Sequence, residues 1–355
     1  MHLLILGGGV FLGARLLSAA LASGHTVTVF NRGRARSVWP TGTEVLTGDR
    51  VADLHLLEGR HWDAVIDTCG YVPADVQASA EALRDACGCY LFVSSVSAYA
   101  DTTEPMTGED HPLAAASGIA RDDRDLRHYG PQKAACEAEV LRVFGARALV
   151  VRPGLIVGPG DRSGRFGHWV WRAAEGGEMV VPDVPEANAL QFIDVRDLAE
   201  WMLRLLEAGT RGALNGSGPV GDAHIGWGTL IAECLAEAAA RGQPPAEVVP
   251  VEEAFLLQHG VQPWSELPLW LPSIAPEYAG FNRDLTRAVA AGLRTRPLRD
   301  TIAAVLAEGI PSADDKRRAG KLTREREAGL IAAWTSSPAG ASRETSRGEG
   351  TAGPA

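Results

Sequence analysis

HLLILGGGVFLG, at positions 2–13, is the stretch that decides the fold. The apolar run His2–Leu6 has the composition of a buried strand, and Val10–Ser23 carries its apolar residues at helical spacing. Three glycines between them allow a tight turn, and the free N–H groups that open a helix stabilise the charge of a pyrophosphate. The stretch therefore predicts a strand, a phosphate loop and a helix that bind a dinucleotide.

The glycine spacing departs from GxGxxG, because Leu12 occupies the place of the last glycine. It is nearer to a GxxGxxG loop in which Val10 replaces the middle glycine. A tight strand–helix turn without a ligand is the alternative. The cofactor contacts expected from the loop are Gly7, Gly9, Phe11, Leu12 and Gly13.

Strand-like and helix-like segments alternate through the first half of the chain. The further predicted strands are Thr26–Phe30, Glu44–Leu46, Ala64–Asp67, Tyr90–Val93 and Ala148–Arg152, and the further helices are Ala74–Ala86 and Gly130–Val143. Continuous apolar strands between amphipathic helices favour a parallel sheet covered on both faces. The fold class predicted is α/β, a Rossmann-type doubly wound parallel sheet with a smaller C-terminal substrate-binding lobe.

The domain boundaries follow from where this regularity weakens. Residues 1–157, with about 190–215, are expected to form the NAD(P)-binding domain. Residues 158–189 and 216–310, rich in tryptophan, proline and glycine, are expected to form the substrate lobe, with the tryptophans filling its core. Residues 311–335 read as a helical extension, and 336–355 as a disordered tail, because they offer almost nothing to bury.

Composition excludes several classes of protein. The 355 residues carry a net charge of −10, which disfavours nucleic acid and anionic membranes as partners. The five cysteines show neither a disulfide framework nor paired CxxC spacing, so buried thiols in a reducing cytoplasm are expected. No stretch approaches the roughly 18 apolar residues of a membrane span, and the apolar N-terminus lacks a basic leader. A soluble cytoplasmic protein is therefore expected.

The end of the second strand bears on the choice of cofactor. Asn31 and Arg32 stand there, followed by Arg34 and Arg36, with no acidic residue to accept bonds from a ribose 2′-OH. Guanidinium groups favour a 2′-phosphate, so NADP is slightly preferred over NAD. A solvated basic turn, with Asn31 alone on the ribose, is the alternative. After the third strand, Asp49 is expected near the adenine amino group and Arg50 beside it.

Two segments carry candidate catalytic residues. Tyr129 and Lys133 are four apart, so on a helix they share one face. A nearby ammonium, together with a positive nicotinamide ring, lowers the pKa of a phenol from its usual value near 10. Tyr129 is therefore expected to exchange a proton with a substrate hydroxyl or carbonyl during hydride transfer. A serine at the end of the fifth strand would hold the same oxygen.

Together, GGGVFLG, SSVSAY, YGPQK, VRPGLIVGPG and QFIDVRDLAEW resemble the extended short-chain dehydrogenase/reductases, the NAD-dependent epimerase/dehydratase family, over about residues 1–310. The resemblance makes Tyr129 and Lys133 the YxxxK pair and Ser95 the strand-end serine. It implies that Lys133 also holds the nicotinamide ribose, and it suggests a homodimer through the helix of Tyr129. Gly70 and Pro153 complete the expected cofactor contacts. The GGxxFLG form resembles a divergent branch with chloroplast RNA-binding members.

Departures from the family pattern narrow the reaction. Val96 and Ser97 stand where the family's dehydratases carry Asp-Glu, and the family's decarboxylases keep a Glu at the second of these positions. Because this sequence lacks those acid/base groups, dehydration and decarboxylation are set aside and hydride transfer remains. Leu155 and Leu190 replace two polar contacts to the diphosphate of sugar nucleotides, which disfavours such a substrate. Arginines elsewhere could substitute; the candidates are Arg162, Arg165, Arg172 and Arg283.

The leading hypothesis is an NAD(P)-dependent reductase, dehydrogenase or epimerase acting on a secondary alcohol or ketone of a modified sugar, cyclitol or similar metabolite. The alternatives are a nucleotide-sugar epimerase with rearranged diphosphate contacts and a cofactor-bound RNA-binding or regulatory protein. No metal site is predicted, because the run Glu109, Asp110 and His111 is interpreted as a solvated turn.

Overall fold

The computed structural model describes residues 1–34, 38–101, 103–221, 224–275 and 282–341. These residues divide between two compact units. The first draws on Met1–Gly160, Gln191–Ala223 and Ala279–Arg296, and the second on Asp161–Leu190, His224–Tyr278 and Pro297–Ala355.

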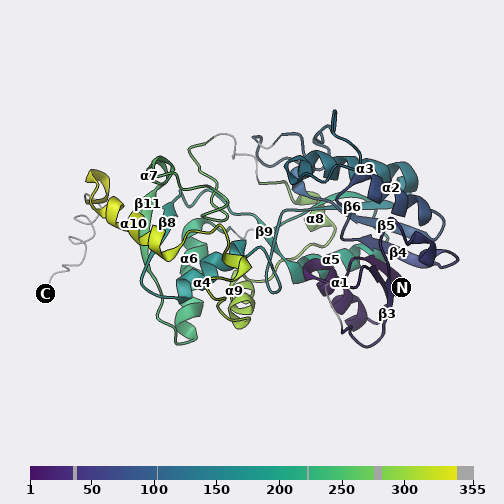
Figure 1. Cartoon of the computed structure of the whole chain (residues 1–355), viewed down its shortest axis with the longest axis horizontal. Helices are drawn as coiled ribbons and strands as arrows, with labels where there is room; N and C mark the ends of the chain where they lie inside the picture. Colours follow the sequence, from purple (N-terminus) through teal and green to yellow (C-terminus); the bar gives the residue numbers. More distant parts are fainter. Residues whose placement is uncertain (35–37, 102, 222–223, 276–281, 342–355) are drawn as a thin grey trace. The chain divides into compact units, whose positions relative to one another are not determined.

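A seven-stranded parallel sheet is the centre of the first unit, with strand order β10-β6-β5-β4-β1-β2-β3 (Figure 1). Its strands are β1 (His2–Leu6), β2 (Thr26–Asn31), β3 (Thr43–Thr47), β4 (Trp62–Asp67), β5 (Cys87–Val93), β6 (Ala148–Pro153) and β10 (Gly212–Gly216). A short parallel pair, β7 (Leu155–Val157) with β9 (Phe192–Asp194), belongs to the same unit. The predicted Rossmann-type sheet is confirmed.

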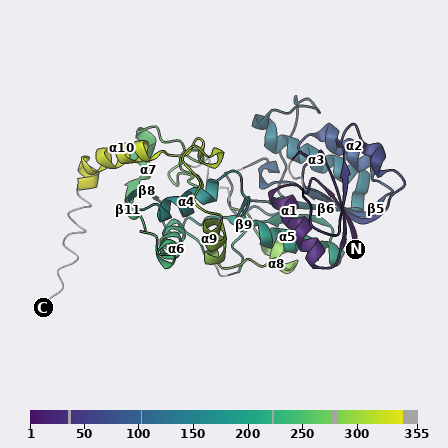
Figure 2. The ribbon, with the colours of Figure 1, turned by 60° about the horizontal axis from the view of Figure 1, so that its bottom comes forward.

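Helices cover both faces of this sheet. They are α1 (Phe11–Ala22), α2 (Pro73–Ala82), α3 (Tyr129–Phe144), α5 (Val195–Glu207) and α8 (Thr286–Ala290). Leu3 and Ile5 of β1 pack into the core on the α1–α5 side, whereas Leu4 and Leu6 pack into the core on the α2–α3 side. Successive residues of a strand point to opposite faces, so one apolar strand supplies both cores. Figures 1 and 2 show the two helix pairs on opposite sides of the strands.

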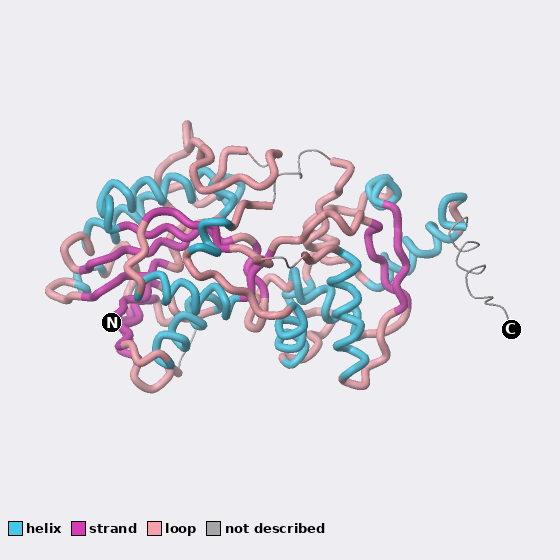
Figure 3. The backbone as a smooth tube through the Cα atoms, turned by 180° about the vertical axis from the view of Figure 1, so that it is seen from behind, coloured by secondary structure: helices cyan, strands magenta, loops and turns pink. Residues whose placement is uncertain are grey.

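The second unit is mainly helical. It contains α4 (Arg165–Ala174), β8 (Glu178–Asp183), α6 (Trp227–Ala240), β11 (Glu247–Glu252), α7 (Glu253–Gln258), α9 (Leu298–Ala307) and α10 (Arg324–Thr335), and Figure 3 shows its β8–β11 pair beside the helices. Trp169, Trp171, Trp227 and Trp270 are buried. These four side chains fill the core of the unit, as the sequence predicts.

Short 3₁₀ helices complete the elements in both units. They are η1 (Leu54–Leu57), η2 (Val96–Ala98), η3 (Leu126–His128), η4 (Gly145–Arg147) and η6 (Lys316–Arg318). Among the described helices, none is long and apolar enough to cross a membrane. All five cysteines are free thiols, and four of them are buried.

Several boundaries differ from those expected. The helix α2 ends at Ala82 rather than at position 86, because Ala86 already pairs its carbonyl with Trp62 beside the start of β5. The described residues 282–296 belong to the first unit, although residues 216–310 were expected in the substrate lobe. Residues 338–341 form a helical turn where disorder was expected, and the remainder of that predicted tail, 342–355, lies outside the described residues.

The first turn of α3 packs directly on η2, and Gly130 makes this contact possible. A methyl group at this position would meet the carbonyl oxygen of Ser97. We expect Gly130→Ala to lower the free energy of unfolding by about 1–3 kcal/mol. The backbone of Ser97 cannot move away from the added methyl group as a flexible side chain would. Urea unfolding followed by circular dichroism measures the change.

Gly329→Ala is the matched control, since this exposed glycine of α10 has no atom within 4 Å of the position of an added Cβ. It should leave stability unchanged or raise it by up to about 1 kcal/mol. Equal effects of the two substitutions would contradict the packing argument.

Candidate cofactor and catalytic site

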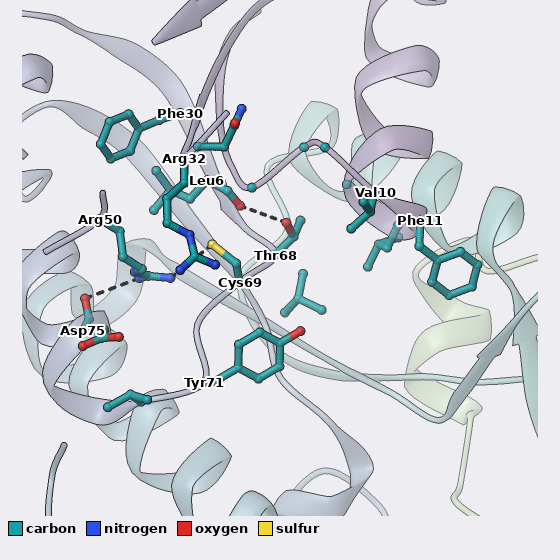
Figure 4. A pocket seen from close by; sticks show the side chains of 18 of the residues that line it. Leu6, Val10, Phe11, Phe30, Arg32, Arg50, Thr68, Cys69, Tyr71 and Asp75 are labelled. Carbon is teal, nitrogen blue, oxygen red and sulfur yellow. Dashed lines mark hydrogen bonds between the residues drawn. The ribbon is translucent and has the colours of Figure 1, made fainter. Parts of the chain in front are cut away.

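A cavity of about 850 Å³ opens at the carboxyl ends of the parallel strands of the first unit (Figure 4). This is where open α/β sheets bind ligands, and the volume lies within the usual range for ligand sites. The predicted residues that line it are Gly7, Gly9, Phe11, Leu12, Gly13, Asn31, Arg32, Asp49, Arg50, Ser95, Tyr129, Lys133 and Pro153. Gly70, the other predicted cofactor contact, is not among the residues that line the cavity.

The glycine loop follows a backbone path that requires residues without side chains. Gly7 and Gly8 adopt φ of +109° and +73°, which side chains rarely tolerate. An added methyl group would meet Thr68 Oγ1 at Gly7, and it would lie 2.7 Å from the Gly8 nitrogen at Gly13. Val10, the N-cap of α1, makes no side-chain hydrogen bond to the helix. The first N–H groups of α1 therefore remain available to an anion.

The ends of β2 and β3 supply polar groups to the cavity. Asn31 accepts a hydrogen bond from Gly33 N–H at 2.7 Å, while its buried Nδ2 has no partner within the described part of the chain. Asp49 accepts from Val51 N–H, which lowers the pKa of its carboxyl, and the charges of Arg32 and Arg124 lower it further. The carboxylate of Asp49 thus stays ionised. Arg36, another of the predicted basic residues, lies outside the described residues.

Arg50 lines the cavity, but its guanidinium group is directed into the protein. It donates to both carboxylate oxygens of Asp67, at 3.0 and 2.8 Å, and to Ser79 Oγ at 2.5 Å. Asp67 is fully buried and also accepts from the hydroxyl of Tyr90 at 2.9 Å. Despite burial, the pKa of Asp67 is lowered by the charge of Arg50. This paired charge forms the floor of the cavity.

Lys133 is held by backbone carbonyls. Its Nζ donates to Gly70 O at 2.7 Å and to Val93 O at 2.6 Å, and it lies 4.3 Å from the centre of the Phe92 ring. Burial lowers the pKa of Lys133 to about 8. An ammonium group has three protons, so one N–H remains for a ligand. Gly70, which does not line the cavity, therefore acts through this lysine.

Tyr129 and Ser95 meet at the same end of the cavity as Lys133. Tyr129 is the first residue of α3, one turn before Lys133, and its half-buried ring lines the cavity. Ser95 Oγ accepts from Ser97 N–H at 3.1 Å, which leaves the proton of its own hydroxyl to donate. The structure thus brings together the three residues predicted to be catalytic.

A buried ion pair holds α3 against the sheet behind these residues. Arg152 donates to Glu137 through Nε and Nη2, with a shortest separation of 2.7 Å, and both side chains are buried. Glu137 lies one turn beyond Lys133 and also accepts from Ser94 Oγ. Arg152 reaches Tyr99 Oη as well, at 3.0 Å. The positions of the helix and of the strand end that carries Ser95 are therefore coupled.

Several lining residues were not predicted: Thr68, Cys69, Tyr71, Asp75 and Arg124. The first three follow β4, so the rule that parallel strands bind ligands at their carboxyl ends would have found them. Arg124 comes from the long irregular segment between β5 and α3, where it pairs with Asp75 at 3.0 Å. No local sequence signal places that segment over the cavity.

The interpretation of positions 109–111 as a solvated turn is wrong for Glu109. This carboxylate is buried and accepts a hydrogen bond from the backbone N–H of Asn215 at 2.9 Å. The bond joins the segment after β5 to β10. Asp110 pairs with Arg287 at the surface. No set of three possible metal ligands occurs among the residues that the structure describes.

Two arginines considered for a substrate diphosphate have internal partners. Arg172 is buried and donates to Glu327 at 2.8 Å. Arg283, also buried, donates to Thr107 Oγ1 and lies 4.7 Å from the centre of the Tyr99 ring.

Comparison with known proteins agrees with the fold. The model of the NAD-dependent epimerase/dehydratase family matches residues 3–217, more than half of the chain. The chain belongs to this family. It is therefore an NAD(P)-dependent enzyme of the short-chain dehydrogenase/reductase type. A search of curated proteins finds no match.

Solved structures similar to this family member share its fold. WbmH of Bordetella bronchiseptica, in complex with NAD⁺, has 17% sequence identity and a TM-score of 0.63, covering 87% of this chain and 99% of that one. UDP-N-acetylglucosamine 4-epimerase of Bacillus cereus has 16% identity and a TM-score of 0.60, covering 88% and 98%. The human epimerase family protein SDR39U1, with NADPH, has 20% identity and a TM-score of 0.54, covering 87% and 100%.

The residues present fit a nicotinamide dinucleotide. The uncapped start of α1 suits a pyrophosphate, and the orphaned Nδ2 of Asn31 suits a ribose oxygen. The remaining N–H of Lys133 suits the second ribose.

The buried ammonium of Lys133 predicts a pH-dependent stability. Its pKa falls from an ordinary 10.5 to about 8 on folding, so the unfolded chain holds the proton over a range where the folded chain has released it. Stability from this group rises by roughly 3 kcal/mol between about pH 8 and pH 10.5. We expect Lys133→Met to remove that rise in urea unfolding measured across the range.

Lys316→Met, at an exposed position of the second unit, is the control and should keep the pH profile of the unaltered protein. A Lys133→Met variant whose stability still rises in parallel with the unaltered protein would show that the lysine is not the source.

Proposed function

We propose that this enzyme transfers hydride at a secondary alcohol or ketone of a small polar metabolite, such as a modified sugar or cyclitol, with Tyr129 as proton donor or acceptor. The observation that carries the proposal is that one cavity contains the uncapped start of α1 together with Ser95, Tyr129 and Lys133. When bound, the nicotinamide supplies or accepts the hydride.

The protein groups divide the remaining work. Tyr129 moves the proton to or from the substrate oxygen, and the ammonium of Lys133, one helical turn away, stabilises the phenolate form. Ser95 donates to the same oxygen and fixes its position. The same groups serve a single reduction or oxidation, and also an oxidation followed by reduction from the opposite face, which is an epimerisation.

Elimination of water lacks support in this cavity. Among the described residues that line it, the carboxylates are Asp49 and Asp75, which stand near Arg32 and Arg124. Val96 and Ser97 follow Ser95 and provide no carboxylate. Plain hydride transfer is the chemistry that the groups beside Tyr129 support best.

We also infer a preference for NADP(H). Arg32 and Arg34 line the cavity at the end of β2 without an ion pair among the described residues, whereas Arg124 is paired with Asp75. No acidic residue stands at the end of β2 to accept bonds from a free 2′-OH. Guanidinium groups bind phosphate oxygens strongly, which supports a 2′-phosphate at this end.

Tyr129→Phe tests the catalytic proposal. The variant should lose turnover by about 10²–10⁴-fold, because it cannot exchange the proton, yet it should bind NADPH as the unaltered enzyme does. Oxidation of NADPH with a panel of cyclic ketones and keto sugars measures turnover, and nucleotide fluorescence measures binding. Unchanged turnover would refute the assigned role.

Absorbance of the purified enzyme near the reduced-nicotinamide band, with mass spectrometry of released nucleotide, separates the two modes of action. Retained NAD would favour an epimerase, whereas empty protein that binds NADPH would favour a reductase.

Arg32→Ala tests the cofactor preference. Loss of a charged hydrogen bond should weaken binding of 2′,5′-ADP by roughly 10- to 100-fold, while 5′-AMP should bind within about 2-fold of its original affinity because it lacks the 2′-phosphate. Isothermal titration calorimetry measures both. Arg84→Ala, an exposed position outside the cavity, is the control. Equal loss for the two nucleotides would contradict a 2′-phosphate contact.

A further inference from the structure

Tyr71 is a large aromatic residue exposed inside the cavity. It follows β4 by four positions, and 51% of its surface is accessible. Figure 4 shows its side chain projecting into the cavity below Cys69. Its hydroxyl has no hydrogen-bond partner within the described part of the chain. An aromatic surface of this size is stabilised when a ligand covers it.

The neighbours of Tyr71 place it at the reactive end of the cavity. Its ring centre lies 6.4 Å from that of Tyr129, and the Nζ of Lys133 lies 5.4 Å from it. The preceding residue, Gly70, gives its carbonyl to the same ammonium, so the backbone beside Tyr71 is fixed. Asn31 and Arg32, by contrast, belong to the end of β2.

The ring is also electrically neutral over the working range of an enzyme. Desolvation in the cavity, followed by the phenol of Tyr129, raises the pKa of Tyr71 to about 12. Tyr71 therefore remains a flat, uncharged surface with a hydroxyl donor at its edge, beside a tyrosine that is expected to ionise.

We propose that Tyr71 is the wall against which the nicotinamide ring of the bound dinucleotide packs. The inference rests on the proposed function, which places the nicotinamide beside Tyr129 and Lys133. The flat ring restricts the position of the nicotinamide in front of the tyrosine that exchanges the proton. The adenosine half makes its contacts elsewhere, with Asn31 and Arg32.

Two probes isolate the contribution of the nicotinamide ring: NADPH, and 2′-phospho-ADP-ribose, which lacks only that ring. Tyr71→Ala should weaken NADPH by roughly 3- to 10-fold, since aromatic contacts of this kind contribute about that much. Tyr71→Ala should bind 2′-phospho-ADP-ribose within about 2-fold of the affinity of the unaltered enzyme. Tyr71→Phe should bind both probes within about 2-fold, because this variant keeps the aromatic ring. Calorimetric titration gives the dissociation constants, and thermal melting confirms that each variant is folded.

Leu126→Ala, an exposed position outside the cavity, is the control and should bind both probes normally. The inference fails if Tyr71→Ala binds NADPH normally, if it loses both probes equally, or if Tyr71→Phe loses as much NADPH as Tyr71→Ala does. An unaltered enzyme that binds neither NADPH nor NADH would instead refute the proposed function itself.

Discussion

The buried ammonium of Lys133 is the contact on which the reactive end of the cavity depends. It joins α3 to the carboxyl ends of β4 and β5 through the carbonyls of Gly70 and Val93. Removing a charge from water is costly unless polar partners replace the water. Position 70, whose carbonyl binds Lys133, has room only for glycine. A methyl group added there would lie 2.5 Å from the Phe92 ring.

Two further buried ion pairs make the surroundings of that lysine rigid. Arg50 and Asp67 close the floor of the cavity, and Arg152 and Glu137 hold α3 and the end of β5 from behind. The opposite charges of each pair offset one another, so they are not offered to a ligand. The guanidinium groups that line the cavity without a described ion pair are those of Arg32 and Arg34. The cavity therefore carries exposed guanidinium groups at one end and the buried ammonium of Lys133 at its reactive end.

This polarity explains why a single pocket suits a phosphorylated cofactor. Phosphate groups favour the uncapped start of α1 and exposed arginines. The hydride transfer proposed for this enzyme needs, in addition, one proton at Tyr129. The half-exposed ring of Tyr71 adds an uncharged surface next to Tyr129 and Lys133.

Much of the first unit was predictable from local pattern. The strands β1, β2, β4, β5 and β6 are short, largely apolar runs, and buried parallel strands have that composition regardless of what surrounds them. The glycines of the first loop are dictated by positive φ and by close approach to Thr68 and to Gly8. Tyr129 and Lys133 share a helix face simply because they are four residues apart.

Other features exist only once the chain has folded. The sequence GALNG of β10 carries little strand signal, and it becomes a strand because it pairs with β6 and because Glu109 binds its Asn215. The sequence predicts Arg50 as a cofactor contact, but its guanidinium group pairs with Asp67, seventeen positions away. The sequence alone determined which residues can turn, pair in a sheet and share a helix face, because those properties are local. Which charges are paired, and which aromatic rings face the cavity, was decided by the tertiary structure, because desolvation and contact depend on residues distant in the chain.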